Sequence, residues 1–180
     1  MKDPFQLLPD SARWPLFLVL SIATMAYSWA LGRQGKELKN PVAPCGIVSY
    51  ELAWAPARSD AIRTSWEVPP KLDTAHQQIH WDFGFLLLYP LPFSLLCAQV
   101  ARRSRRTGAS TGFTLSRAVL MAAPLDFVED LILLHLLDHG ATGIVAVASL
   151  AATFKFALLL VALGYVVIQG GRVLWQRVRD

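Results

Sequence analysis

Three acidic residues, Asp126, Glu129 and Asp130, lie in the middle of an otherwise apolar stretch. Their spacing of three and four positions places the three carboxyl groups on one face of a helix. Lys155 lies at a matching depth in the next apolar stretch and is their obvious counter-ion. Charges near a bilayer centre cost about 2.5 to 3.5 kcal/mol each on insertion scales, so they usually face one another or a wet cavity. The pattern therefore predicts a polar site inside a membrane protein. A structural ion pair and a functional pocket both explain it.

Two more acids are expected near this face. Asp82 begins the second apolar stretch, and Glu51 belongs to an apolar part of the loop that precedes it. We expect both to approach Glu129 or Asp130 from the outer side, so that the site opens outward. The alternative is that Asp82 interacts with the N-terminal end of its own helix dipole and that Glu51 is solvated.

All histidines of the chain occur in two pairs spaced four residues apart. This spacing lets two imidazoles on one helix bind one metal ion such as zinc. A two-residue motif is weak evidence, and histidine is also common at membrane interfaces as a polar tip. We therefore predict no cofactor, although a metal ion or a bound lipid would suit the charged groups. The pairs are His76 with His80, and His135 with His139.

The composition is that of an integral membrane protein. Hydrophobic residues make up 54% and charged residues 17% of the 180-residue chain, and the mean hydropathy is +0.39. About 20 helical residues cross a hydrocarbon core about 30 Å thick, and four segments reach that length. We predict an all-α membrane domain with spans at residues 14–32, 81–100, 118–137 and 143–169.

Short helices and breaks are predicted around these spans. The loop of residues 33–79 contains GIVSYELAWA and SDAIRTSWEV, which are too short to cross and are expected to lie as two short helices on the outer membrane surface. Pro90 and Pro92 should interrupt the helix of the second span, and Pro124 that of the third.

Arginine residues collect in two places, the linker between spans two and three and the C-terminal tail. Positively charged loops stay on the cytoplasmic side, so four spans place both termini in the cytoplasm. Topology thus explains the net charge of +4, and we predict contact with the lipid bilayer and no nucleic-acid partner. The residues are Arg102, Arg103, Arg105, Arg106, Arg117, Arg172, Arg177 and Arg179.

Four segments together resemble a family of small bacterial four-helix membrane proteins of unassigned function: GIVSYELAW, DFGFLLLYPLPFSLLC, APLDFVEDLILLHLL and FKFALLLVALGY. The likeness extends over nearly the whole chain and implies the bacterial cytoplasmic membrane. In the family pattern asparagine stands at the position of Asp130, and the histidine pairs are not part of it. The positions that the resemblance carries over are Glu51, Asp82, Tyr89, Asp126, Glu129 and Lys155.

Several functional interpretations stay open. P-loop, nucleophile-elbow, CxxC and glycine-rich dinucleotide motifs are missing from the sequence, so nothing indicates a particular reaction. We favour non-catalytic binding of a small amphiphile or of a partner membrane protein. The alternatives are an enzyme acting on a lipid or isoprenoid, an accessory subunit of a respiratory or photosynthetic complex, and a metal-dependent enzyme that uses the histidine pairs. A larger complex or a homo-oligomer is compatible with each.

Overall fold

The computed structural model describes residues 3–68, 70–104 and 106–179. Pro69 of the predicted loop and Arg105 of the basic linker lie outside the described residues, as do the side chains of Arg106 and Arg177. Throughout the described part of the chain, regular secondary structure is helical and no strand occurs. The predicted all-α class is therefore confirmed.

The helices follow one another with short connections. They are α1 (Asp10–Gln34), the 3-10 helix η1 (Gly35–Leu38), α2 (Ile47–Glu51), α3 (Pro56–Ser65), α4 (Lys71–Phe85), α5 (Pro90–Arg103), α6 (Arg106–Leu120), α7 (Ala122–His139) and α8 (Val145–Arg179). The chain forms two compact units. Unit 1 comprises Met1–Thr24, Leu88–Ala123 and Lys155–Asp180, and unit 2 comprises Met25–Leu87 and Pro124–Phe154.

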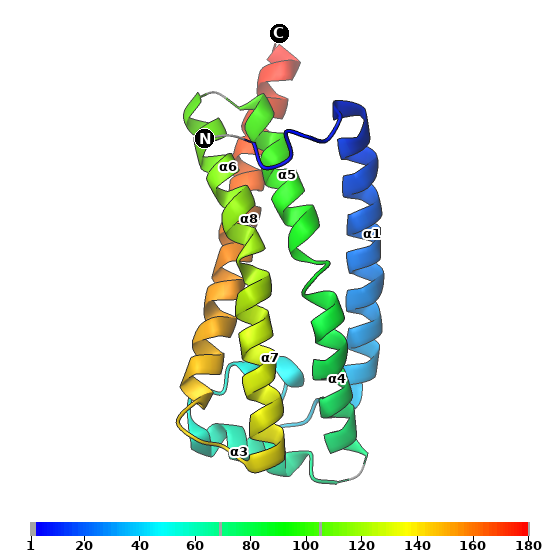
Figure 1. Cartoon of the computed structure of the whole chain (residues 1–180), viewed down its shortest axis with the longest axis vertical. Coiled ribbons are helices and arrows are strands. Elements are labelled where there is room, and N and C mark those ends of the chain that lie inside the picture. Colours follow the sequence, from blue (N-terminus) through cyan, green and yellow to red (C-terminus); the bar gives the residue numbers. More distant parts are fainter. Residues whose placement is uncertain (1–2, 69, 105, 180) are drawn as a thin grey trace. The chain divides into compact units, whose positions relative to one another are not determined.

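Proline interrupts the helices at the predicted places. Within the predicted span 81–100, α4 ends at Phe85 and α5 begins at Pro90, with a non-helical link between them (Figure 1). Proline has no N–H to donate and its φ angle suits the first helical position, so it starts α5 instead of continuing α4. A second break at Met121 separates α6 from α7, and Pro124 falls in the first turn of α7.

Within the part of the chain that the structure describes, three helical stretches are long and apolar enough to cross a membrane: Asp10–Leu38, Lys71–Arg103 and Val145–Val173. They contain the predicted spans 14–32 and 81–100 entirely and span 143–169 from Val145 onwards. The predicted span 118–137 does not join them, because the 18 residues of α7 include the acids Asp126, Glu129, Asp130 and Asp138.

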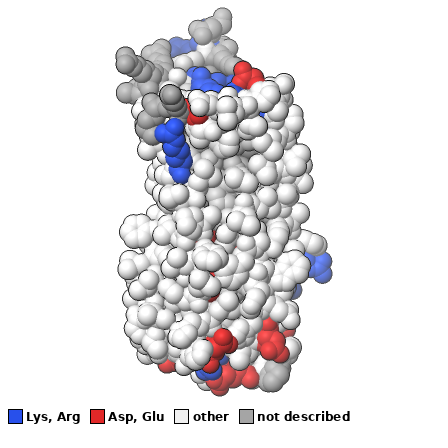
Figure 2. All heavy atoms as spheres, viewed as in Figure 1, with Lys and Arg blue, Asp and Glu red and all other residues white. Residues whose placement is uncertain are grey.

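Large apolar side chains are exposed along the outer faces of α1 and α8. Ile22, Met25 and Trp29 of α1 are 64–71% exposed, and Leu160 and Val167 of α8 are 65–68% exposed. Figure 2 shows a broad surface of uncharged side chains on the face in view. Soluble monomers rarely expose contiguous apolar surface of this extent, whereas lipid tails cover it.

The core of unit 2 joins the short helices to the end of α7. The indole N–H of Trp66, fully buried, donates to the carbonyl oxygen of Leu38 at 2.8 Å. Arg63 of α3 donates to the carbonyl oxygen of Leu137 at 2.8 Å, and α3 lies at that end of α7 in Figure 1. The segment between η1 and α4 is therefore a packed part of unit 2.

The core of unit 1 is built where α5, α6 and α8 meet. Cys97, Val119, Ala162 and Tyr165 form a buried apolar cluster. Ser94 of α5 and Ser116 of α6 are fully buried, and the hydroxyl of Ser116 donates to the carbonyl oxygen of Ser94 at 2.8 Å. Such interhelical hydrogen bonds help to hold helices together inside a bilayer, where burial of apolar surface gives little driving force.

Candidate functional site

The acidic face of α7 is buried inside unit 2. Asp126, Glu129 and Asp130 are at most 2% exposed, and the half-buried Asp82 lies on the last turns of α4. Carboxylate oxygens of Asp82, Asp126 and Asp130 all lie within 4.8 Å of one another. The structure thus brings three of the predicted site residues together, and Asp82 meets Asp126 and Asp130 of the predicted acidic face. We call these three residues the carboxylate cluster.

Contacts on both sides of Asp82 hold it in place. The ring of Phe83 packs edge-on against that of Phe127, with centroids 5.5 Å apart, which joins α4 to α7 beside the cluster. On the other side, the hydroxyl of Tyr27 of α1 donates to the carbonyl oxygen of Trp81 at 2.7 Å. Helices on both sides of α4 therefore fix the orientation of the turn that carries Asp82.

The spacing of the cluster has an electrostatic consequence. Two ionised carboxylates 4.8 Å apart repel each other by about 3.5 kcal/mol at an effective dielectric constant of about 20. Asp126 and Asp130 are buried, so water screens their repulsion poorly. Carboxyl groups in such an arrangement are stabilised by a cation, by a positively charged side chain or ligand, or by shared protons.

Glu51 is a buried residue of the short helices. Glu51 is only 6% exposed, so the alternative in which it is solvated is wrong. The hydroxyl of Ser149 of α8 donates to the carbonyl oxygen of Glu51 at 2.8 Å and accepts from the backbone N–H of Trp54 at 2.9 Å. Ser149 thereby ties the segment between α2 and α3 to α8. No motif singles out this serine, and its only signal in the sequence is a polar residue within an apolar helix.

Tyr89 and Lys155 belong to unit 1, whereas the carboxylate cluster belongs to unit 2. Tyr89 is the N-cap residue of α5 and is 5% exposed. Lys155 of α8 is 4% exposed, and its ammonium group lies 5.2 Å from the centroid of the Phe156 ring. Both are buried polar side chains, as expected of residues that face the interior of a helical bundle.

The histidine pairs are placed differently from the cluster. His76 Nε2 lies 3.4 Å from an oxygen of Asp138, and the rings of His135 and His139 stack with centroids 4.5 Å apart. Among the described residues, the carboxylate cluster is the one group of three side chains whose donor atoms are close enough to hold a metal ion, and it includes no histidine. An all-oxygen donor set suits a hard cation such as Mg²⁺ or Ca²⁺ better than zinc.

No protein-family model, curated protein or solved structure matches this chain. Its class is therefore defined by its own features. Its described residues are all-helical in their regular structure, with three stretches able to cross a membrane and with a carboxylate cluster in one of the two units.

Proposed function

We propose that this chain is a four-span protein of the bacterial cytoplasmic membrane that binds a small amphiphile without transforming it. The bound group is cationic or donates hydrogen bonds, and it is held by the carboxylate cluster. The observation that carries the proposal is the approach of three carboxylates within 4.8 Å, with Asp126 and Asp130 at most 2% exposed. An amphiphile fits because the helices around the cluster expose apolar surface, through which a guest would enter from the bilayer.

The fourth crossing in this proposal is supplied by α6 and α7. Arginines cluster both after the Lys71–Arg103 stretch and at the end of α8. An even number of crossings places these two segments and the N-terminus on one side, as the positive-inside rule requires. With three crossings, the arginines of the tail would be exported. The resemblance to small bacterial four-helix membrane proteins supports the same topology.

A second candidate function is an enzyme that acts on a lipid or isoprenoid. Asp126 and Asp130 favour it, since closely spaced buried carboxyl groups share protons and can act as a proton donor and acceptor pair. A partner membrane protein, or a larger respiratory or photosynthetic complex, is a further occupant of the apolar surface. The experiment below separates these outcomes.

The test is native mass spectrometry of the full-length protein extracted gently from its own membranes, with elemental analysis of the same sample. The cluster variants are Asp82→Asn and Asp126→Asn, and the matched control is Asp138→Asn, an exposed aspartate of the same helix as Asp126. We expect a reproducible small molecule on the wild type and the control, and at least about tenfold lower occupancy in both cluster variants. Asp82 is half-buried, so its variant keeps the test usable if Asp126→Asn does not fold.

The other outcomes are equally informative. A wild type that carries only bulk lipid, or equal occupancy in all variants, would overturn the proposal. If the wild type carries stoichiometric Mg²⁺ or Ca²⁺ and the cluster variants lose it, the ligand of the cluster is a metal ion and not an amphiphile. Changed membrane lipid composition in cells that carry folded cluster variants would favour the enzyme, and co-purified subunits would favour the accessory role.

A further inference from the structure

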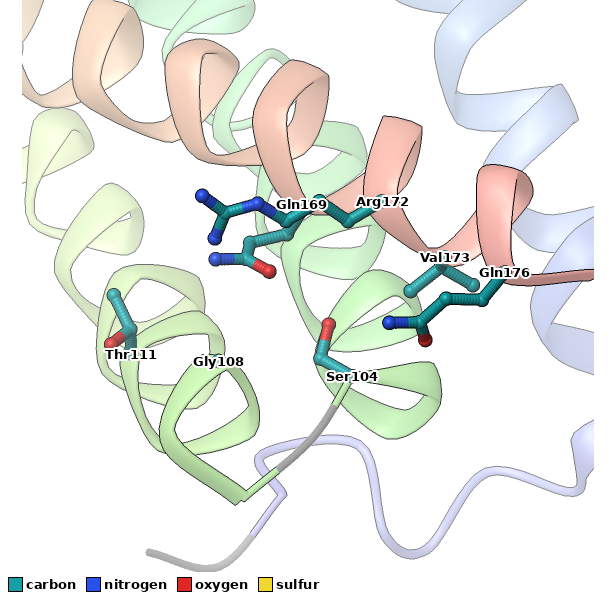
Figure 3. Close-up of a pocket in the computed structure, with 7 residues that line it drawn as sticks. All are labelled: Ser104, Gly108, Thr111, Gln169, Arg172, Val173 and Gln176. Carbon is teal, nitrogen blue, oxygen red and sulfur yellow. The ribbon is translucent and has the colours of Figure 1, made fainter.

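Unit 1 contains a polar cavity of about 410 Å³. Side chains and backbone from three segments line it, and it is shown in Figure 3. Small-molecule sites are commonly cavities of about 300 to 1,000 Å³. The residues that line the cavity are Ser104 after α5, Gly108 and Thr111 of α6, and Gln169, Arg172, Val173 and Gln176 of α8. We call it the headgroup pocket, for the reasons that follow.

The lining offers hydrogen-bond donors and one permanent positive charge. In Figure 3, Gln169 and Arg172 extend from α8 toward α6, and the hydroxyl of Ser104 is directed toward α8. Gly108 lies in the first turn of α6, where backbone N–H groups and the helix dipole also favour an anion. Guanidinium, amide and hydroxyl groups around one space are a donor set for phosphate oxygens.

The charge balance of unit 1 leaves Arg172 available for a guest. In the described part of this unit the carboxylates are those of Asp3 and Asp10, and both form ion pairs with Arg102. Arg172 forms no ion pair with any residue that the structure describes, and its side chain is exposed. An anion is therefore the expected guest of this pocket.

The position of the pocket along the helices indicates where the anion comes from. Arg102 and Arg103 directly precede Ser104 at the end of α5, and Arg172 ends an uncharged run of α8 that begins at Phe156. Residues at the ends of membrane-crossing stretches lie at the level of the lipid headgroups. Basic residues at this level on the cytoplasmic side attract anionic lipids.

We propose that the headgroup pocket binds the phosphate group of an anionic phospholipid. Arg172 supplies the counter-charge, and the side-chain amide of Gln169 donates a hydrogen bond to a phosphate oxygen, while the hydroxyl of Ser104 donates to the carbonyl oxygen of Val100 at 2.9 Å and lines the pocket. Inorganic phosphate shares this chemistry, and the experiment separates the two sources. The proposal is independent of the carboxylate cluster, because every residue of the pocket belongs to unit 1.

The experiment is a titration of the full-length, delipidated protein in detergent, followed by native mass spectrometry. The probes are phosphatidylglycerol, a diacylglycerol with the same acyl chains and no phosphate, and inorganic phosphate. The test variant is Arg172→Gln. The matched control is Arg179→Gln, which removes the same charge from the same helix outside the pocket, where Arg179 lies 5.7 Å from the Trp175 ring centroid.

We expect one phosphatidylglycerol to be retained by the wild type and by Arg179→Gln. Diacylglycerol should bind at least about tenfold more weakly, and Arg172→Gln should lose phosphatidylglycerol by a similar factor, as expected when a charge-assisted hydrogen bond is removed. A second variant, Gly108→Ala, fills the pocket without changing charge. Its methyl group would lie 3.1 Å from Ser104 Cβ and 3.3 Å from Gln169 Oε1, so it should also weaken binding.

Each contrary result overturns a definite part of the proposal. Equal losses in the two arginine variants would show diffuse surface attraction. Unchanged binding in both Arg172→Gln and Gly108→Ala would show that the lipid binds elsewhere. Tight binding of inorganic phosphate that displaces phosphatidylglycerol would assign the pocket to a soluble anion. Thermal unfolding of each variant is measured alongside. Because Arg172 is exposed, we expect Arg172→Gln to unfold at the same temperature as the wild type.

Discussion

The buried hydroxyl of Ser149 leads to a sharp prediction about the short helices of unit 2. This hydroxyl is fully buried, donates to the carbonyl oxygen of Glu51 and accepts from the N–H of Trp54. In a Ser149→Ala variant, both backbone groups lose their side-chain partner. We expect the segment between α2 and α3 to open more readily, while the helices of the unit stay folded.

The expected cost follows from these two bonds. A hydrogen bond contributes about 0.5 to 1.5 kcal/mol net, and a buried group left without a partner costs about 1 to 3 kcal/mol. The strained backbone of Trp54, with a φ of 60°, is present in the wild type and in the variant, so it does not contribute to the difference between them. The loss of the two hydrogen bonds predicts about 2 to 3 kcal/mol less free energy of opening for this segment.

Hydrogen exchange of the full-length protein in nanodiscs measures this opening. For Ser149→Ala we expect the amides of residues 46–55 to exchange about 30-fold faster or more, since 1.4 kcal/mol corresponds to a factor of about ten. The control is Thr153→Ala, one turn further along α8, because the exposed Thr153 only donates to the carbonyl oxygen of Ser149 within its own helix. Equal exchange in Ser149→Ala and Thr153→Ala would refute the reasoning.

Three further predictions concern buried contacts elsewhere in the chain. In Gly112→Ala the new methyl group would lie 2.6 Å from Tyr165 Cζ, so overpacking should destabilise unit 1 by about 1 to 3 kcal/mol, and an unchanged melting temperature would contradict the contact. Trp66→Phe removes the indole N–H that serves the Leu38 carbonyl, and it should cost about 1 to 2 kcal/mol in thermal unfolding. Burial raises the pKa of Tyr50, and the charge of nearby Asp60 adds to the rise while Ser59 and Arg63 oppose it. The folded state therefore favours the neutral phenol of Tyr50. The contribution of this group to the free energy of unfolding is fully present below about pH 10 and is lost as the pH rises through the raised pKa. Tyr50→Phe should abolish this loss of stability at alkaline pH in melting curves.

The sequence predicts those features that depend on local chemistry. Helix length and hydropathy locate α1 and α8, because a membrane-crossing helix needs a long uncharged run and little else. The break before Pro90 follows from the missing N–H of proline. The common face of Asp126 and Asp130 follows from the helical repeat.

Features that depend on packing between distant segments are not predictable in this way. Asp82 joins Asp126 and Asp130 because α4 packs on α7 through the ring contact of Phe83 with Phe127, and no spacing rule specifies that contact. Ser149 is a single serine in an apolar helix, and its two backbone partners lie more than 90 positions earlier in the chain. The headgroup pocket likewise combines residues of α6 and α8 with Ser104.

Asp130 shows how one residue type alters the chemistry of the proposed site. The family pattern invoked from the sequence resemblance would place asparagine at this position, and asparagine can both donate and accept hydrogen bonds but carries no charge. In this chain the residue is an aspartate that belongs to the carboxylate cluster and is 2% exposed. With asparagine there, Asp82 and Asp126 would be the only acids of the cluster and one carboxylate repulsion would remain in place of three. Each added carboxylate raises the demand for positive charge, so the ligand that we propose for this chain should be more strongly cationic than one suited to the asparagine pattern.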